Sequence, residues 1–159
     1  VLWLLAGSTR AQENLRAHAR SHGVGPERLV FARTLPQAQH LARLMLADLS
    51  LDTLPYNAHT TASDALWAGV PHVACTGQSF AARVGASLLH AVGLPQLVGQ
   101  DLAHYERLLM RLLLDDPTRQ RVRDRLAQVR QQAPLWDAQA FAQALEQAYT
   151  AMVDEAARR

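Results

Sequence analysis

The chain has 159 residues, of which 49% are hydrophobic, and this is enough apolar material for the core of one domain of ordinary size. The net charge is only +2, and the 16 basic residues, all arginine, are spread along the chain without interleaved aromatic residues, which argues against a nucleic-acid-binding surface. The apolar opening Val1–Leu5 is too short to span a bilayer and follows no basic residue, so we expect neither a signal peptide nor a membrane partner.

Cys75 is the single cysteine and lies in an apolar run. It cannot form an internal disulfide, and we interpret it as a buried strand residue in a reducing compartment, which indicates a cytoplasmic protein. The chain begins at Val1 without a methionine, in what we interpret as the middle of a strand. We therefore expect a fragment of a longer protein.

Apolar runs alternate with helical patterns over the first hundred residues, and only helical patterns follow. The expected strands are Val1–Leu5 (buried on both faces), Leu29–Phe31, Asp48–Leu51, His72–Thr76 and Leu97–Val98. The expected helices are Gln12–His22, Gln37–Leu46, Thr60–Trp67, Phe80–Val92, Leu102–Leu114, Thr118–Gln131 and Ala138–Ala157. This order predicts an α/β fold, a Rossmann-like parallel sheet with flanking helices. We expect a single domain over 1–159, with residues 1–100 as its α/β part and 101–159 as a helical tail that braces the far side of the sheet.

The short helix that follows His59 is the centre of the functional interpretation. Thr60 or Thr61 can cap it, and the first amides of a helix have no intrahelical partner, so an anion is favoured there. A phosphate is the expected ligand. Asp64 lies one turn further on and can accept hydrogen bonds from sugar hydroxyls. A purely local capping arrangement of Thr60 and Asp64 is the alternative.

Several motifs resemble the C-terminal half of the O-GlcNAc transferase family, including its bacterial members and the plant Spindly branch. The motifs are Asp48–Asn57, His59–Thr61, Asp64–Pro71, Phe80–Val84, Gly93–Pro95, Pro134–Trp136 and Leu145–Tyr149. The resemblance implies that residues 1–159 are a single nucleotide-sugar-binding domain in the C-terminal half of a two-domain GT-B glycosyltransferase. The intact enzyme would transfer GlcNAc from UDP-GlcNAc to Ser or Thr hydroxyls of an acceptor protein, with upstream helical repeats that capture this partner, and without a metal or other cofactor.

The resemblance also assigns roles to individual residues. His59, Thr60 and Thr61 would hold the diphosphate and Asp64 the ribose hydroxyls. His40 and Arg43, otherwise a solvated surface pair on one helix face, would contact uracil, and Leu35 would offer backbone groups to the base edge.

Two departures from the family open alternatives. Gln37 stands where the family has lysine, which points to weaker diphosphate binding or to another nucleotide such as GDP-fucose. The family's catalytic lysine lies upstream, and a chain without lysine cannot supply it, so we assign no catalytic residue here and expect the fragment alone to be inactive. A degenerate scaffold domain and a UDP-GlcNAc epimerase are the competing functions.

Asn57 is interpreted as fixing the loop before the central helix. The aromatic residues are interpreted as core positions, namely Trp3, Trp67, Phe80 and Trp136. In a doubly wound sheet the first strand is central, and in this family it would precede Val1. We therefore expect Val1–Leu5 to pair directly with Asp48–Leu51, or a strand to be borrowed from a neighbour.

Overall fold

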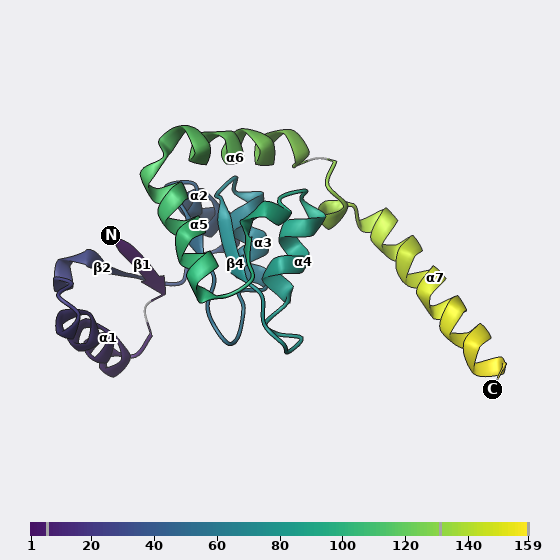
Figure 1. Ribbon diagram of the computed structural model, residues 1–159, viewed down its shortest axis with the longest axis horizontal. Coiled ribbons are helices and arrows are strands. Elements are labelled where there is room, and N and C mark those ends of the chain that lie inside the picture. Colours follow the sequence, from purple (N-terminus) through teal and green to yellow (C-terminus); the bar gives the residue numbers. More distant parts are fainter. Residues whose placement is uncertain (6, 131, 159) are drawn as a thin grey trace. The chain divides into compact units, whose positions relative to one another are not determined.

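The computed structural model describes residues 1–5, 7–130 and 132–158, which fall into two compact units, Val1–His40 and Leu41–Arg159. Figure 1 labels their helices and strands. The strands are β1 (Leu2–Leu5), β2 (Leu29–Ala32), β3 (Ser50–Leu51), β4 (His72–Cys75) and β5 (Val98–Gly99). The helices are α1 (Thr9–Ser21), α2 (Gln37–Leu44), α3 (Thr60–Trp67), α4 (Val84–Ala91), α5 (Leu102–Leu114), α6 (Asp116–Val129) and α7 (Ala138–Ala157). The predicted end of α6 at Gln131 lies outside the described residues.

The first unit is built on a two-stranded parallel sheet. β1 pairs with β2 in the register Leu2 opposite Leu29, and α1 makes the crossover between them. The prediction that the first strand is buried on both faces is wrong, because Leu2 is 43% exposed and Leu5 is 69% exposed. Two strands and one helix are too few to enclose both faces of a sheet.

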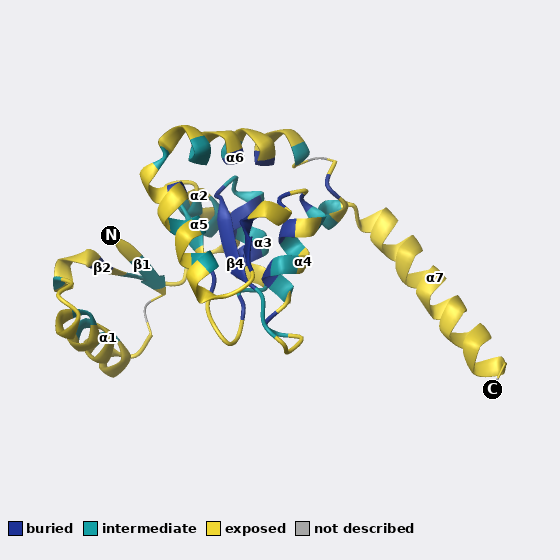
Figure 2. Cartoon of the chain, in the orientation of Figure 1, coloured by how far each residue is buried: buried dark blue, intermediate teal, exposed yellow. Residues whose placement is uncertain are grey.

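The second unit contains a three-stranded parallel sheet in the order β3-β4-β5. The central strand β4 is buried at all four residues, as its dark colour in Figure 2 shows. Its residues are apolar apart from His72, as expected for a strand covered on both faces. The first strand and the third lie in different units, in which β1 pairs with β2 and β3 pairs with β4, so the pairing of the first strand with the third stays a prediction.

Helices α3, α4 and α5 pack against β4 and enclose the core of the second unit. Parallel strands with flanking helices confirm the predicted Rossmann-like fold class. Twelve buried side chains form the main cluster: Leu66, Val73, Ala74, Leu89, Val92, Leu94, Leu97, Val98, Leu112, Val122, Leu126 and Ala133.

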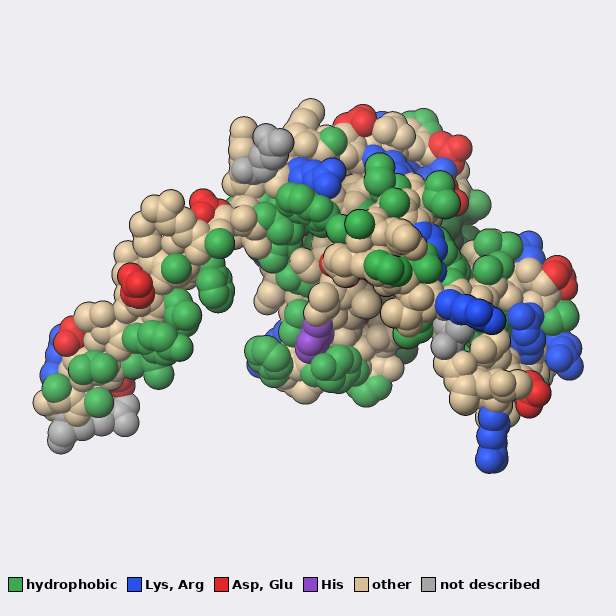
Figure 3. Space-filling view, turned by 180° about the vertical axis from the view of Figure 1, so that it is seen from behind, with side chains coloured by type: hydrophobic (Ala, Val, Ile, Leu, Met, Phe, Trp, Pro, Cys, Tyr) green, Lys and Arg blue, Asp and Glu red, His purple; other side chains and the backbone are tan. Residues whose placement is uncertain are grey.

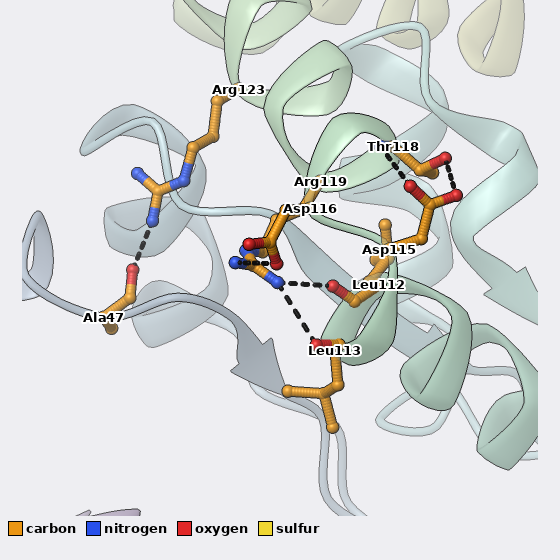
Figure 4. Close-up of polar contacts among 8 residues, drawn as sticks. All are labelled: Ala47, Leu112, Leu113, Asp115, Asp116, Thr118, Arg119 and Arg123. Atoms are coloured by element: carbon orange, nitrogen blue, oxygen red, sulfur yellow. Dashed lines mark hydrogen bonds and ion pairs between the residues drawn. The ribbon is translucent and has the colours of Figure 1, made fainter.

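Polar contacts fix α6 to the elements that precede it (Figure 4). The Asp115 carboxylate caps α6, accepting from the Thr118 amide at 2.9 Å, and Arg119 Nη1 donates to the Leu112 carbonyl at 2.8 Å. Arg123 donates to the carbonyl of Ala47, in the loop that leads to β3. The position of α6 is therefore determined by hydrogen bonds as well as by its apolar face.

The last helix, α7, is exposed at every residue, so the prediction that the tail braces the sheet is wrong for this part of it. α5 packs directly on β4 and β5, and α6 packs on α5. Apolar side chains gather along one side of α7 (Figure 3). The large ones are Phe141, Leu145, Tyr149, Met152 and Val153.

Candidate functional site

Two loops of the second unit open at the same edge of its sheet. One runs over residues 52–59 from β3 to α3, and the other over residues 76–83 from β4 to α4. They share an edge because parallel strands place their carboxyl ends together, where α/β proteins bind ligands. The candidate site is built from these loops and from the start of α3.

The helix α3 begins at Thr60 with an uncapped end. His59 is the N-cap residue and its side chain does not cap, so the predicted capping by Thr60 or Thr61 is wrong. The amides of Ala62 and Ser63 both donate to the His59 carbonyl, at 3.1 and 3.0 Å. In the part of the chain that the structure describes, the amides of Thr60 and Thr61 make no hydrogen bond, and both residues are exposed. The helix start therefore presents two amide donors and two hydroxyls to solvent.

Aromatic contacts hold the imidazole of His59 beside this helix start. The Tyr56 ring stacks on it with centroids 4.7 Å apart, and the Phe80 ring meets it edge-on at 6.5 Å. Its Nε2 atom lies 3.4 Å from the Ala81 carbonyl oxygen. Both loops thus contribute to the orientation of His59.

Phe80 is 77% exposed, so its predicted core position is wrong. The predicted helix from Phe80 in fact begins at Val84, because the preceding segment closes on itself. The Ala82 amide donates to Ser79, and the Gly77 amide donates to the Ala82 carbonyl at 2.8 Å.

A buried carboxylate ties the two ends of the 52–59 loop together. Asp52 is 6% exposed, and its Oδ1 atom accepts from the amides of Thr53 at 2.9 Å and Ala58 at 2.6 Å. Its Oδ2 atom has no hydrogen-bond partner among the described residues. Burial raises the pKa of Asp52 against the lowering effect of the amides that point at it. The sequence interpretation missed this residue, and its position immediately after a strand was the available signal.

Asn57 fixes the same loop, as predicted from the sequence. It is 1% exposed, and its Nδ2 atom donates to the carbonyls of Thr53 at 3.2 Å and Cys75 at 3.3 Å. Its Oδ1 atom accepts from the Gly85 amide at 3.4 Å. This one side chain therefore links the 52–59 loop to β4 and to α4.

The other structural interpretations are confirmed in part. Cys75 is buried in β4 with a free thiol. Trp67 and Trp136 pack edge to face with centroids 5.3 Å apart, and the Arg130 guanidinium lies over Trp67 at 4.3 Å. Trp3, in β1, is half-buried.

The predicted site residues fall into both units. His59, Thr60, Thr61 and the half-buried Asp64 lie together at the start of α3, with Asp64 one turn beyond Thr60. Leu35 lies in the loop before α2, Gln37 and His40 lie in the part of α2 that belongs to the first unit, and Arg43 lies in the second unit. The grouping of all eight residues at one site stays a prediction.

Across the described ranges, no helix is both long and apolar enough to cross a membrane. Within these same ranges, no three His, Cys, Asp or Glu side chains gather in a way that could hold a metal ion.

Comparisons with known proteins agree with the fold. An O-GlcNAc transferase mutant from Thermobaculum terrenum superimposes with a TM-score of 0.86 and 34% identity, over 91% of this chain and 28% of that one. The UDP-N-acetylglucosamine–peptide N-acetylglucosaminyltransferase of Caenorhabditis elegans is 34% identical over 92% of this chain. The probable enzyme SEC of Arabidopsis thaliana is 35% identical over 95% of it.

The chain spans 13% and 16% of the lengths of these last two relatives. The profile described as glycosyl transferase family 41 matches residues 1–145. A match over most of the chain, together with the shared fold, shows that the chain belongs to glycosyltransferase family 41.

Proposed function

We propose that this chain is the donor-binding part of a protein O-GlcNAc transferase, and that it holds the diphosphate of UDP-GlcNAc at the start of α3. The observation that supports this site is the uncapped helix end, where the exposed amides and hydroxyls of Thr60 and Thr61 lie at the carboxyl edge of a parallel sheet. Helix N-termini favour anions because the dipole and the unpaired amides act together.

The remaining contacts of the donor follow from the chemistry of the side chains. His59 contributes to the diphosphate site through its backbone amide, and Asp64 accepts hydrogen bonds from the ribose hydroxyls. On α2, His40 stacks on the base and Arg43 donates to its carbonyl oxygens. Leu35 offers backbone groups to the base edge, and Gln37 lies where a charged contact to the nucleotide would otherwise be made.

The reaction belongs to the intact protein. Transfer of GlcNAc to a Ser or Thr hydroxyl is favoured by contacts that hold the departing diphosphate more tightly in the transition state than in the bound donor. This chain supplies such contacts from Thr60 and Thr61, whereas the leaving-group lysine, the acceptor site and the tetratricopeptide repeats that recruit the protein partner would come from other parts of the protein. The lone buried thiol of Cys75 supports a cytoplasmic location.

Calorimetric titration of the intact protein with UDP, UDP-GlcNAc and GDP-fucose tests the proposal. We expect UDP and UDP-GlcNAc to bind, and Asp64→Ala to weaken UDP-GlcNAc binding by roughly 1.5–3 kcal/mol through the loss of hydrogen bonds to a charged acceptor. Asp154→Ala, on exposed α7, is the matched control and should leave the affinity unchanged. An unaltered affinity of Asp64→Ala would remove this residue from the site.

A second donor is favoured by one observation, the neutral Gln37 in place of the family's lysine. Preferential binding of GDP-fucose in the same titration would assign the chain to a Spindly-like O-fucosyltransferase. A folded protein that binds none of the three nucleotides would be a scaffold domain instead.

A further inference from the structure

A cavity outside the α3 site lies in the second unit between the turn after α4 and the helices α5 and α6. Its volume is about 370 Å³, within the range of small-molecule pockets. Four apolar side chains form its floor, and each is at most 7% exposed. They are Leu94, Leu97, Leu112 and Val122. The cavity shares no residue with the loops 52–59 and 76–83.

Three arginines line the mouth of this cavity. Arg111 comes from α5, and Arg121 and Arg125 come from α6. Arg121 donates to the Thr118 hydroxyl at 2.5 Å. Arg125 reaches across to the turn after α4, because its Nη2 atom lies 3.6 Å from the point where a Cβ of Gly93 would stand. Among the described residues, none of the three guanidinium groups forms an ion pair with a carboxylate.

The local charge is positive. Asp115 is the acidic group on which these arginines act. Hydrogen bonds from Thr118, and then the charges of Arg121 and Arg111, hold the pKa of Asp115 below its ordinary value. The two carboxylates within α6 have partners away from the mouth: Asp116 pairs with Arg119, and Asp124 accepts from Gln120. Three guanidinium groups against one carboxylate leave a surplus of positive charge over an apolar floor.

We propose that this cavity binds a small organic anion, with a phosphate or carboxylate head on the three arginines and a short apolar body on the leucine and valine floor. A guanidinium group binds both kinds of head through paired N–H donors. The floor adds affinity in proportion to the apolar area that leaves water. Both parts of the ligand are needed, because each half of the cavity satisfies only one of them.

Hexyl phosphate is a suitable probe, titrated calorimetrically into the whole chain at low salt. We expect one site, with inorganic phosphate and hexanol each binding at least tenfold more weakly than the probe that joins them. The double variant Arg121→Gln/Arg125→Gln should weaken hexyl phosphate binding at least tenfold. Arg107→Gln, an exposed position of α5 that does not line the cavity, is a control for the loss of surface charge and should have no effect.

Gln96→Trp gives an independent test, because it places a large side chain at the exposed rim and leaves every charge intact. It should also weaken hexyl phosphate binding at least tenfold, while circular dichroism melting confirms that each variant is folded. The proposal is overturned if 10 mM hexyl phosphate does not bind, if inorganic phosphate binds equally well, or if both sets of variants bind as the unaltered chain does.

Discussion

The Oδ1 atom of Asp52 accepts a hydrogen bond from the amide of Ala58, six residues further along the chain, at 2.6 Å. The same atom accepts from the Thr53 amide, so one oxygen closes the loop that leads into α3. The carboxylate is ionisable, yet the two amides need only a neutral acceptor. Its geometric role and its charge can therefore be separated by mutation.

Asp52→Asn should keep the loop and remove the charge. We expect it to raise the free energy of unfolding at pH 8 by about 1 kcal/mol, because an amide is less costly to bury than an ion. Asp52→Ala should lower this free energy by about 1–3 kcal/mol, since two amides lose their acceptor. Urea denaturation measures both, and equal destabilisation by the two variants would contradict the separation of roles.

The Asp52 charge also makes the stability of the fold depend on pH. Its pKa in the folded state lies above the unfolded value, so the unfolded chain loses this proton first as the pH rises. The contribution of Asp52 to stability is therefore largest below the unfolded pKa and is lost as the pH rises through the folded pKa. Asp52→Asn should remove this part of the pH profile.

His72 makes stability depend on pH in the opposite direction to Asp52. It is fully buried, its Nδ1 atom lies 3.0 Å from Ser50 Oγ, and burial lowers its pKa to about 4. The contribution of neutral His72 to the free energy of unfolding is complete above the unfolded pKa of about 6.5. This contribution, on the order of 3 kcal/mol, is lost as the pH falls toward 4. His72→Gln should lower stability at pH 7 but flatten the profile between pH 7 and 4.5 in urea denaturation. The exposed His90→Gln, on α4, should leave the profile as it is.

Gly85 lies inside α4, where alanine normally stabilises a helix by about 1 kcal/mol. Here a Cβ would stand 2.7 Å from Asp52 Oδ2 and 2.9 Å from the Ala74 Cβ. We expect Gly85→Ala to lower the melting temperature, because neither neighbour can withdraw from the core. Ser87→Ala, an exposed position of the same helix, should not lower it. A stabilised Gly85→Ala variant would show that the sheet tolerates this approach.

Tyr105 connects α5 to the same region. Its hydroxyl donates to the Asp52 carbonyl at 2.9 Å, and burial, with the charge of Asp52, raises the pKa of Tyr105 to about 12. Tyr105→Phe should lower the free energy of unfolding by about 1 kcal/mol. It should also remove the latest phase of the tyrosinate absorbance titration. Tyr149→Phe, on exposed α7, should change neither the stability nor that phase.

Helices with strong signals at both ends were predictable from the sequence. The predicted bounds of α5 and α7 match those observed, because Asp101 and Asp137 cap their starts and a regular apolar spacing follows. The start of α4 was predicted four residues too early, since Phe80 continues the apolar spacing of that helix. Local hydrogen bonds around Ser79 and Ala82 are not visible in such a pattern.

Features of the candidate site that are set within one loop were predictable from the sequence. Features that depend on elements distant in the sequence were not. The helix start at Thr60 and the role of Asn57 follow from residue types in one loop. The burial of Asp52 depends on α4 and α5, which come more than thirty residues later in the chain, so no local pattern reveals it. The exposure of the first strand likewise depends on which strands surround it.

The thiol of Cys75 is a built-in probe of how often the second unit opens. It is the chain's single sulfhydryl and lies at the end of the strand that the other two strands of the sheet flank, and burial raises its pKa, so it reacts slowly while the sheet is closed. The rate of alkylation of this thiol therefore reports how often the second unit opens. A donor that binds beside α3 should make this opening less frequent. Its binding would therefore lower the rate at which the Cys75 thiol is alkylated.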